Sequence, residues 1–439
     1  MDFLKDNIGK LYRKFLAAAF GSALMTSIYG VVDMAMVGQY HGPNGAAAMA
    51  VIAPIWNIIY SLGLLCGIGG SVLYSVQRGK NEDLETANQY FSVSVFLAVL
   101  CSILCLVLLW GFEEPLLRLF GANDELLALA KRYLITVKFF APFFVFTQTL
   151  SAFLRNDSNP SLATAAVCIG GIFNVFGDYF FVFTLDMGIM GAGLATGLGA
   201  LCSCLVMSTH FFSKKCSLRF ATPKKIGNIC GKIIGAGFSS FFLDIAMGIL
   251  TMLFNRQIMY YFGENELAVY GVIVNISTFV QCCAYGVGQA SQPIFSQNFG
   301  ARQYARIRQL IKYNILTIFL LGSVWTISVM AVPNGFITLF MTPTERVLVI
   351  APFILRCYAS SFLLLLFNVY STYYFQSVLE PLTAMIVSVS RGLLLSGALI
   401  LLLPKLFNAN SIWLAMTVTE IGTAAFAIGK MKKLMSEQK

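Results

Sequence analysis

Charged side chains are scarce in this chain. Of its 439 residues, only 11% are Asp, Glu, Lys or Arg, whereas 58% are hydrophobic. A soluble protein of this length needs a much larger polar surface to cover its core. The apolar residues also gather in long runs, such as 95–109 and 315–332. The composition therefore excludes a soluble globular domain.

Histidine is scarce as well, and cysteine forms no pattern. The chain has 2 His and 11 Cys, and most of the cysteines lie inside apolar segments. No spacing is typical of a zinc site or of a disulfide framework. A membrane-embedded enzyme would need a nucleophile–base pair or a set of metal ligands, and neither stands out. We therefore expect neither an enzyme nor a bound cofactor.

The apolar runs predict membrane-spanning helices. A helical run of about 20 apolar residues matches the ~30 Å hydrocarbon core of a bilayer. A helix also satisfies its own backbone hydrogen bonds in lipid, and the alternation typical of barrel strands is absent. The predicted spans are 14–38, 46–75, 90–112, 132–154, 161–184, 188–212, 234–262, 267–295, 310–333, 347–376, 382–404 and 409–430. This prediction is an all-α integral membrane protein with twelve transmembrane helices.

Basic residues are distributed unevenly between the predicted loops. Loops on one side of the predicted membrane hold 21 Lys and Arg residues, Lys439 included, and loops on the other side hold 5. The positive-inside rule then places both termini in the cytoplasm. No cleavable signal peptide is evident, because the basic segment 1–14 leads directly into a span. The net charge of +10 is thus an orientation signal, and we expect no nucleic-acid partner.

The chain repeats itself at about half its length. The matching pairs, all at a constant offset of 221, are Gly67 with Gly288, Ser75 with Ser296, Gly79 with Gly300 and Pro160 with Pro381. Each half has six predicted spans, and this even number gives both halves the same orientation. We predict an N-lobe at 1–212, a basic cytoplasmic linker at 213–230 and a C-lobe at 231–439. Parallel repeats are typical of transporters with a substrate site near the midplane and alternating access. A symmetric scaffold without transport is the alternative.

Two acids occur where a membrane helix should have none. Asp33 and Asp178 lie at similar depth in spans 1 and 5, Asn174 is one turn before Asp178, and Thr196 lies at matching depth in span 6. An ionisable residue inside a span is a functional candidate by default. Two carboxylates, an amide oxygen and a hydroxyl suit Na⁺, which prefers oxygen ligands, and they suit H⁺ equally. A purely structural hydrogen-bond network is the alternative.

The second half does not repeat these acids. At the offset of the repeat, Asp33 corresponds to Phe254, with Asn255 one place along, and Asp178 corresponds to Leu399. We therefore expect the cation site to be confined to the first half. Further polar residues of the second half are candidates for a secondary path, namely Asp244, Asn255 and Glu420.

Other charged or titratable residues near the span ends have simpler interpretations. We expect Arg356 and Arg391 to snorkel toward the interface or to pair structurally. We expect the two histidines, His41 and His210, to be solvated at the ends of spans.

Several motifs resemble the multidrug and toxic compound extrusion (MATE) family over nearly the whole chain. They are Asp33-Met-Ala-Met-Val-Gly-Gln-Tyr-His-Gly42, Ser75-Val-Gln-Arg-Gly79, Leu154-Arg-Asn-Asp-Ser-Asn-Pro160, and Gln289-Ala-Ser-Gln-Pro293 with Asn298-Phe-Gly-Ala-Arg302. The resemblance implies a multi-pass protein of the plasma (inner) membrane with V-shaped lobes. Such a protein would expel organic cations or amphiphilic drugs in antiport with H⁺ or Na⁺. We expect small-molecule substrates and membrane lipids as partners, and a monomer.

The resemblance also suggests roles for particular residues. Asp33, Asn174, Asp178 and Thr196 match positions that bind the coupling cation in the N-lobe of similar prokaryotic transporters. Span 10, where other branches carry an acid, has only Asn368. Some relatives bend span 1 at a proline, but no proline occurs between Leu11 and Gly38.

A flippase for lipid-linked oligosaccharides is the alternative function, since such proteins have a similar two-lobe plan. A flippase for anionic headgroups would be expected to carry several basic cavity residues. The candidate positions here are acidic or neutral, which favours cationic cargo.

Overall fold

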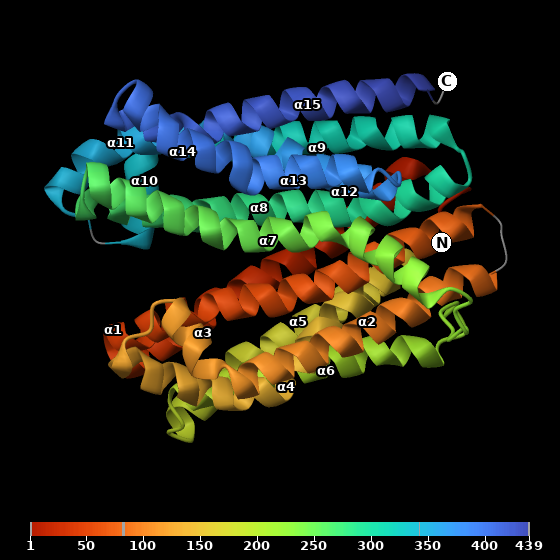
Figure 1. Cartoon of the computed structure of the whole chain (residues 1–439), viewed down its shortest axis with the longest axis horizontal. Helices are drawn as coiled ribbons and strands as arrows, with labels where there is room; N and C mark the ends of the chain where they lie inside the picture. The colour runs from red at the N-terminus through yellow and green to blue at the C-terminus, as the bar shows by residue number, and fades with distance from the viewer. Residues whose placement is uncertain (1, 81–83, 342, 438–439) are drawn as a thin grey trace. The chain divides into compact units, whose positions relative to one another are not determined.

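The computed structural model describes residues 2–80, 84–341 and 343–437. Lys439, counted above among the basic loop residues, lies outside this part of the chain. The described residues form helices, most of them joined by short connections, with no strand among them (Figure 1). Twelve of these helices are long and apolar enough to cross a membrane. The predicted all-α fold and the number of spans are confirmed.

The first half supplies six of the spans. Its helices are α1 (Ile8–Gly79), α2 (Leu84–Gly111), α3 (Glu113–Leu119), α4 (Asp124–Asn156), α5 (Pro160–Asp178), the π-helix η1 (Tyr179–Thr184), α6 (Ile189–Ser208) and the 3₁₀ helix η2 (Thr209–Phe212). Helix α1 holds the first two spans, Ile8–Gly42 and Asn44–Gly79. They meet at Gly42, whose φ of 64° is a conformation that favours glycine.

The second half supplies the other six. Its helices are α7 (Ile226–Tyr261), α8 (Glu264–Gly300), α9 (Tyr304–Ala331), α10 (Pro333–Phe340), α11 (Glu345–Ala359), α12 (Phe362–Ser377), α13 (Pro381–Val389), the π-helix η3 (Ser390–Leu394), α14 (Leu395–Leu406), the 3₁₀ helix η4 (Ala409–Leu414) and α15 (Ala415–Glu437). The short helices α3 and α10, which we did not predict, occupy equivalent places in the two halves.

Polar caps set the starts of the helices that follow tight connections. At α4, the Asn123 side chain accepts a hydrogen bond from the backbone N–H of Leu126. At α5, Asn159 accepts from the N–H of Leu162, and Pro160 takes the first helical position. Both arrangements satisfy backbone donors that the first turn leaves free. The connection between α4 and α5 is therefore short and well defined.

The chain forms two compact units. The first comprises Met1–Asp6, Ala17–Phe241 and Ser296–Arg302, and the second comprises Asn7–Leu16, Phe242–Phe295 and Gln303–Lys439. These bounds differ from the lobes and linker expected from the sequence in a few short stretches. The segment 213–230, for example, packs with the first unit.

Helices α2, α4, α5 and α6 of the first unit pack side by side (Figure 1). Helices α5 and α6 approach closely because two glycines face each other. A Cβ at Gly170 would lie 2.4 Å from the carbonyl oxygen of Gly199, and a Cβ at Gly199 would lie 2.7 Å from the carbonyl oxygen of Gly170. Small residues are the usual means of close helix approach in membranes, where the hydrophobic effect does not drive helices together. This contact fixes α5 and α6 where they carry polar side chains.

A second close approach joins two glycines that are equivalent in the repeat. Gly79 ends α1 and Gly300 ends α8, and both belong to the first unit. A Cβ at Gly79 would lie 2.1 Å from the carbonyl oxygen of Gln297, and a Cβ at Gly300 would lie 2.0 Å from that of Val76. The obstacle in both cases is backbone, which cannot rotate away as a side chain can.

We predict that Gly79→Ala and Gly300→Ala each destabilise the protein. The added methyl group overpacks a backbone contact, which costs about 1–3 kcal/mol, or roughly 3–10 °C in apparent melting temperature. Thermal unfolding of the purified protein in detergent measures the effect. Gly231→Ala is the matched control, because no atom lies within 4 Å of a Cβ at this helical position. It should leave the melting temperature unchanged or raise it slightly. Equal behaviour of all three variants would contradict the close contact.

Candidate functional site

The first unit brings together the four residues that the sequence singled out. Asp33 comes from α1, Asn174 and Asp178 from α5, and Thr196 from α6. All four are buried, with exposed fractions of 5%, 2%, 0% and 7% in that order. Their proximity follows from the equal depth of the spans and from the close packing of α5 on α6.

Hydrogen bonds link these side chains into one chain, which we call the carboxylate cluster. The Asn174 amide nitrogen donates to the Thr196 hydroxyl oxygen at 3.0 Å and to Asp178 Oδ1 at 3.4 Å. The Thr196 hydroxyl donates in turn to Asp33 Oδ2 at 3.4 Å. Asp33 and Asp178 are thus connected through an amide and a hydroxyl.

Tyr133 of α4 is a fifth member that the sequence did not indicate. Its hydroxyl donates to Asp33 Oδ2 at 3.0 Å, and the ring is fully buried against Trp56, with the ring centroids 6.3 Å apart. Tyrosine is common in membrane spans, so its type alone carried no signal. Only the packing of α4 against α1 and α6 reveals that this hydroxyl faces an acid.

The carboxylate cluster has more acceptors than donors. Asp33 Oδ1, Asn174 Oδ1 and Asp178 Oδ2 are buried and have no hydrogen-bond partner among the described residues. Nor does any described Lys, Arg or His pair with either carboxylate. Burying a charge without a partner costs several kcal/mol. The arrangement is suited to a group that supplies positive charge and accepts oxygen ligands, either a proton or a hard cation.

The backbone changes geometry directly after the second acid. Helix α5 ends at Asp178, and the π-helix η1 continues from Tyr179 to Thr184. Single π-helical turns are rare and occur frequently at functional sites, because they rotate the following side chains relative to the preceding turn. Because of this wider turn, the side chains after Asp178 do not continue the helix face on which Asn174 and Asp178 lie.

The three residues proposed for a secondary path lie in different surroundings. Asp244 accepts a hydrogen bond from the Tyr285 hydroxyl at 2.6 Å, and its second oxygen has no partner among the described residues. Glu420 is fully buried and pairs with Arg391 at 2.7 Å, so this arginine pairs structurally as expected. Asn255 is exposed. Within the described part of the chain, no hydrogen bond or ion pair joins these three residues as those of the carboxylate cluster are joined.

The expectation that His210 is solvated was wrong. The ring has an exposed fraction of 0%, and its Nε2 lies 2.8 Å from Asp157 Oδ2. Asp157 also pairs with Arg78 at 2.9 Å and accepts from the backbone N–H of Ser217 at 3.0 Å. Burial raises the pKa of Asp157, but the hydrogen bonds from His210 and Ser217 and the Arg78 charge outweigh it, so the pKa lies below the ordinary value. The residues after α6 fold back onto the α4–α5 connection, which the sequence pattern could not show.

The fold and the carboxylate cluster define a class, a multi-pass membrane transporter made of two six-helix halves with a cluster of two intramembrane acids in its first half. The family model described as MatE matches this chain twice, at residues 18–180 and 239–400. The separation between the starts of the two matches equals the offset of the internal repeat. The chain belongs to the MatE family of transporters and is not an enzyme.

Relatives and solved structures agree with this assignment. The chain is 24% identical over 415 residues to the multidrug export protein MepA of Staphylococcus saprophyticus, covering 94% of this chain and 89% of that protein. It is 23% identical to MepA of a Staphylococcus aureus strain over the same coverage. Among solved structures, an outward-facing multidrug resistance MATE transporter superposes with a TM-score of 0.91 at 20% identity, covering 99% of this chain and 98% of that one. A transporter of the same superfamily from Pyrococcus furiosus also reaches 0.91, at 21% identity with the same coverage.

We predict opposite stability effects for two buried acids of the first unit. Asp178→Asn removes a carboxylate that has no basic partner, so the apparent melting temperature should stay the same or rise. Asp157→Asn leaves Arg78 without its buried partner, and it should lower the melting temperature by at least about 5 °C. Thermal unfolding of both variants at neutral pH checks the pair. A large destabilisation by Asp178→Asn would indicate that the carboxylate cluster is a structural network instead.

Proposed function

We propose that this transporter exports organic cations or amphiphilic drugs in antiport with H⁺ or Na⁺, by alternating access of its two halves. The coupling cation would bind at the carboxylate cluster. One observation carries the proposal, namely that Asp33 and Asp178 are buried in one hydrogen-bonded chain without a basic partner among the described residues. A structural network of this kind would be more stable with a neutral residue at one position.

The oxygen atoms of the cluster support a cation in particular. A proton on one carboxylate would remove a formal charge and supply the donor that the surplus acceptors lack. Na⁺ would instead take the free oxygens of Asp33, Asn174 and Asp178 as ligands. Both options use only groups already in place, and neither needs a nitrogen or sulfur ligand.

Coupling requires that the cation prefers one conformational state. Moving a balance from 1:99 to 99:1 takes about 5.5 kcal/mol of differential affinity. Neutralising a buried carboxylate can supply several kcal/mol of this. Because the carboxylate cluster joins α1, α4, α5 and α6, cation binding would change the cohesion of these helices. A drug that favours the cation-free state is then exchanged for the cation without direct contact between the two.

The substrate class rests on the acids and on the relatives. A negatively charged interior favours cationic cargo, and the relatives are multidrug export proteins by name. We further propose a plasma-membrane protein with both termini in the cytoplasm, because the loops on that side carry the basic excess. A monomer suffices for this mechanism, since all five residues of the cluster come from one chain.

We predict that Asp33→Asn and Asp178→Asn abolish gradient-driven export. The purified protein would be reconstituted into liposomes that contain a fluorescent organic cation. The rate at which this cation leaves the liposomes would then be measured under an imposed pH gradient or an imposed Na⁺ gradient. Wild type should respond to one of the gradients, and this names the coupling ion. Each Asn variant should lose at least about 100-fold in rate, because neither can carry the coupling charge.

Asp244→Asn is the matched control, since Asp244 is also a carboxylate within a span. It should retain export if the coupling site is confined to the carboxylate cluster. Export that persists in both cluster variants would contradict the proposed mechanism. If well-folded wild type exports no cation under either gradient, a fluorescent lipid should be tested instead, because lipid flipping is the alternative function.

A further inference from the structure

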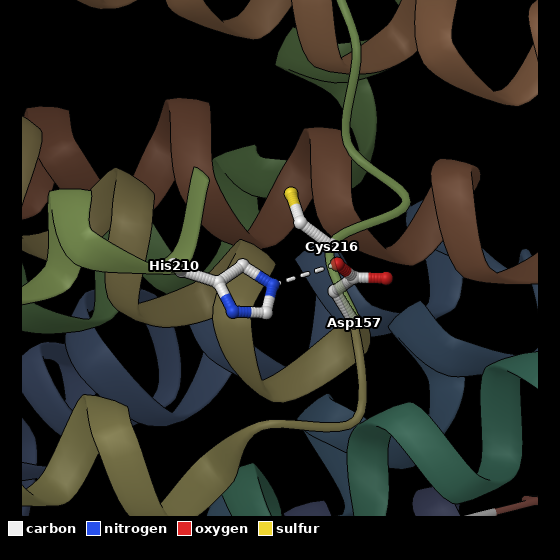
Figure 2. Close-up of side chains that lie close together, drawn as sticks. All are labelled: Asp157, His210 and Cys216. Atoms are coloured by element: carbon white, nitrogen blue, oxygen red, sulfur yellow. Dashed lines mark hydrogen bonds and ion pairs between the residues drawn. The ribbon is translucent and has the colours of Figure 1, made fainter. Parts of the chain in front are cut away.

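A second group of titratable side chains lies in the first unit, away from the carboxylate cluster. Asp157 lies in the connection between α4 and α5, His210 in η2 and Cys216 in the segment between η2 and α7. One ligand atom from each residue lies within 4.8 Å of those of the other two (Figure 2). Figure 2 shows the imidazole and the carboxylate facing each other, with the thiol beside them.

We propose that Asp157, His210 and Cys216 form a binding site for a thiophilic divalent metal ion, with Zn²⁺ as the best fit. Imidazole nitrogen, thiolate sulfur and carboxylate oxygen are the three kinds of ligand that Zn²⁺ takes from proteins. Mg²⁺ and Ca²⁺ prefer oxygen ligands alone, so the thiol and the imidazole disfavour them. Three protein ligands leave a fourth tetrahedral position for water.

The carboxylate is already oriented for this role. Asp157 Oδ1 accepts from Arg78 at 2.9 Å, from the Tyr74 hydroxyl at 3.4 Å and from the Ser217 hydroxyl. These bonds hold one oxygen, while the other, Oδ2, faces His210 Nε2 at 2.8 Å and also accepts from the backbone N–H of Ser217 at 3.0 Å. Hydrogen bonds that fix a ligand from behind are typical of metal sites. Oδ2 can therefore bind a metal while Oδ1 keeps its partners.

Both ring nitrogens of the imidazole have a polar neighbour. Its Nε2 faces Asp157, and its Nδ1 lies 3.1 Å from the Asn159 amide nitrogen. When Nε2 binds a metal, the ring proton moves to Nδ1. The Asn159 oxygen already accepts from the Leu162 N–H at the start of α5, so metal binding gives up the hydrogen bond between Nδ1 and the Asn159 amide nitrogen.

The thiol of Cys216 takes no part in the hydrogen bonds between Asp157 and His210, so these bonds do not explain its position. Cys216 Sγ is half-buried and bonds weakly to the Leu218 carbonyl oxygen at 3.6 Å, rather than to Asp157 or His210. Burial raises the pKa of the Cys216 thiol, so a metal must displace its proton. Three ligands and this proton make the site weaker and more reversible than a four-ligand structural zinc site. Occupancy would hold the start of the segment after η2 against the α4–α5 connection.

The test uses the purified full-length protein in detergent, treated with a chelator and then desalted. Co²⁺ is titrated alone as the optical probe, because it replaces Zn²⁺ in tetrahedral sites and gives a sulfur-to-cobalt charge-transfer band. Wild type should show this band at one equivalent, and Zn²⁺ should abolish it by displacement. Cys216→Ser should lose the band, and His210→Gln should weaken Co²⁺ binding by at least about tenfold.

Matched controls separate this site from other ligands in the chain. Cys357→Ser replaces a half-buried cysteine of the second unit, and His41→Gln replaces the other histidine. Both should keep the band, as should Asp33→Asn and Asp178→Asn, because the carboxylate cluster contains no sulfur. The proposal is overturned if wild type shows no band, or if the band persists in Cys216→Ser.

Thermal unfolding shows whether a variant that loses the band is still folded. Cys216→Ser keeps the hydrogen bonds between Asp157 and His210, so its melting temperature without metal should match that of wild type. Zn²⁺ should raise the melting temperature of wild type, as any ligand that binds only the folded state does, and the shift should vanish in Cys216→Ser. An equal shift in both proteins would place the bound metal elsewhere.

Discussion

The cost of burying charge within a membrane protein is the constraint that organises this structure. An ionised carboxylate in such surroundings must find a cation, a set of donors or a proton. The chain meets this demand in three different ways. Asp157 is saturated by Arg78, His210 and Ser217, and Glu420 is paired with Arg391 and with the Asn368 amide. Among the described residues, Asp33 and Asp178 receive only neutral donors.

This difference separates structural acids from the acids proposed to work in transport. A paired acid stabilises one conformation, because breaking the pair leaves a buried charge. A buried acid without a basic partner can remain ionised at low cost only while a mobile cation is bound to it. The free energy of the conformation that buries it therefore changes when the cation binds or leaves. A transporter needs the second kind at the coupling site and the first kind wherever helices must hold together. The two kinds can be distinguished here by their partners, not by their burial, which is nearly complete for all of them.

Much of the fold and part of the carboxylate cluster could be predicted from the sequence, because helices in a bilayer obey simple geometry. A fixed rise per residue and a fixed span length place Asp33, Asp178 and Thr196 at one depth. Asn174 follows from the spacing of one turn. Which faces of different helices meet depends on packing, so Tyr133 was not predicted. The burial of His210 depends on how a loop folds back, and hydropathy carries no information on that.

The two halves of the repeat share close helix contacts at glycines, but they do not share the acids of the carboxylate cluster. Gly67 allows α1 to approach α4 at the backbone of Gln148 and Thr149 and at the side chain of Ala152, and Gly288 allows α8 to approach α12 at the ring of Tyr373. Tyr373 stands at the position equivalent to Ala152 in the repeat, so the same contact exists in both units even though a methyl group has become an aromatic ring. The close approach of these helices therefore requires a glycine, and both halves keep a glycine at this position. Asp33 and Asp178 have no acidic counterpart in the second half, where Phe254 and Leu399 stand at the equivalent positions. A residue that the repeat retains thus serves the shared scaffold. An intramembrane acid that the repeat does not retain has to be judged by its partners: Glu420, which corresponds to Gly199, is paired with Arg391, whereas Asp33 and Asp178 have no basic partner among the described residues.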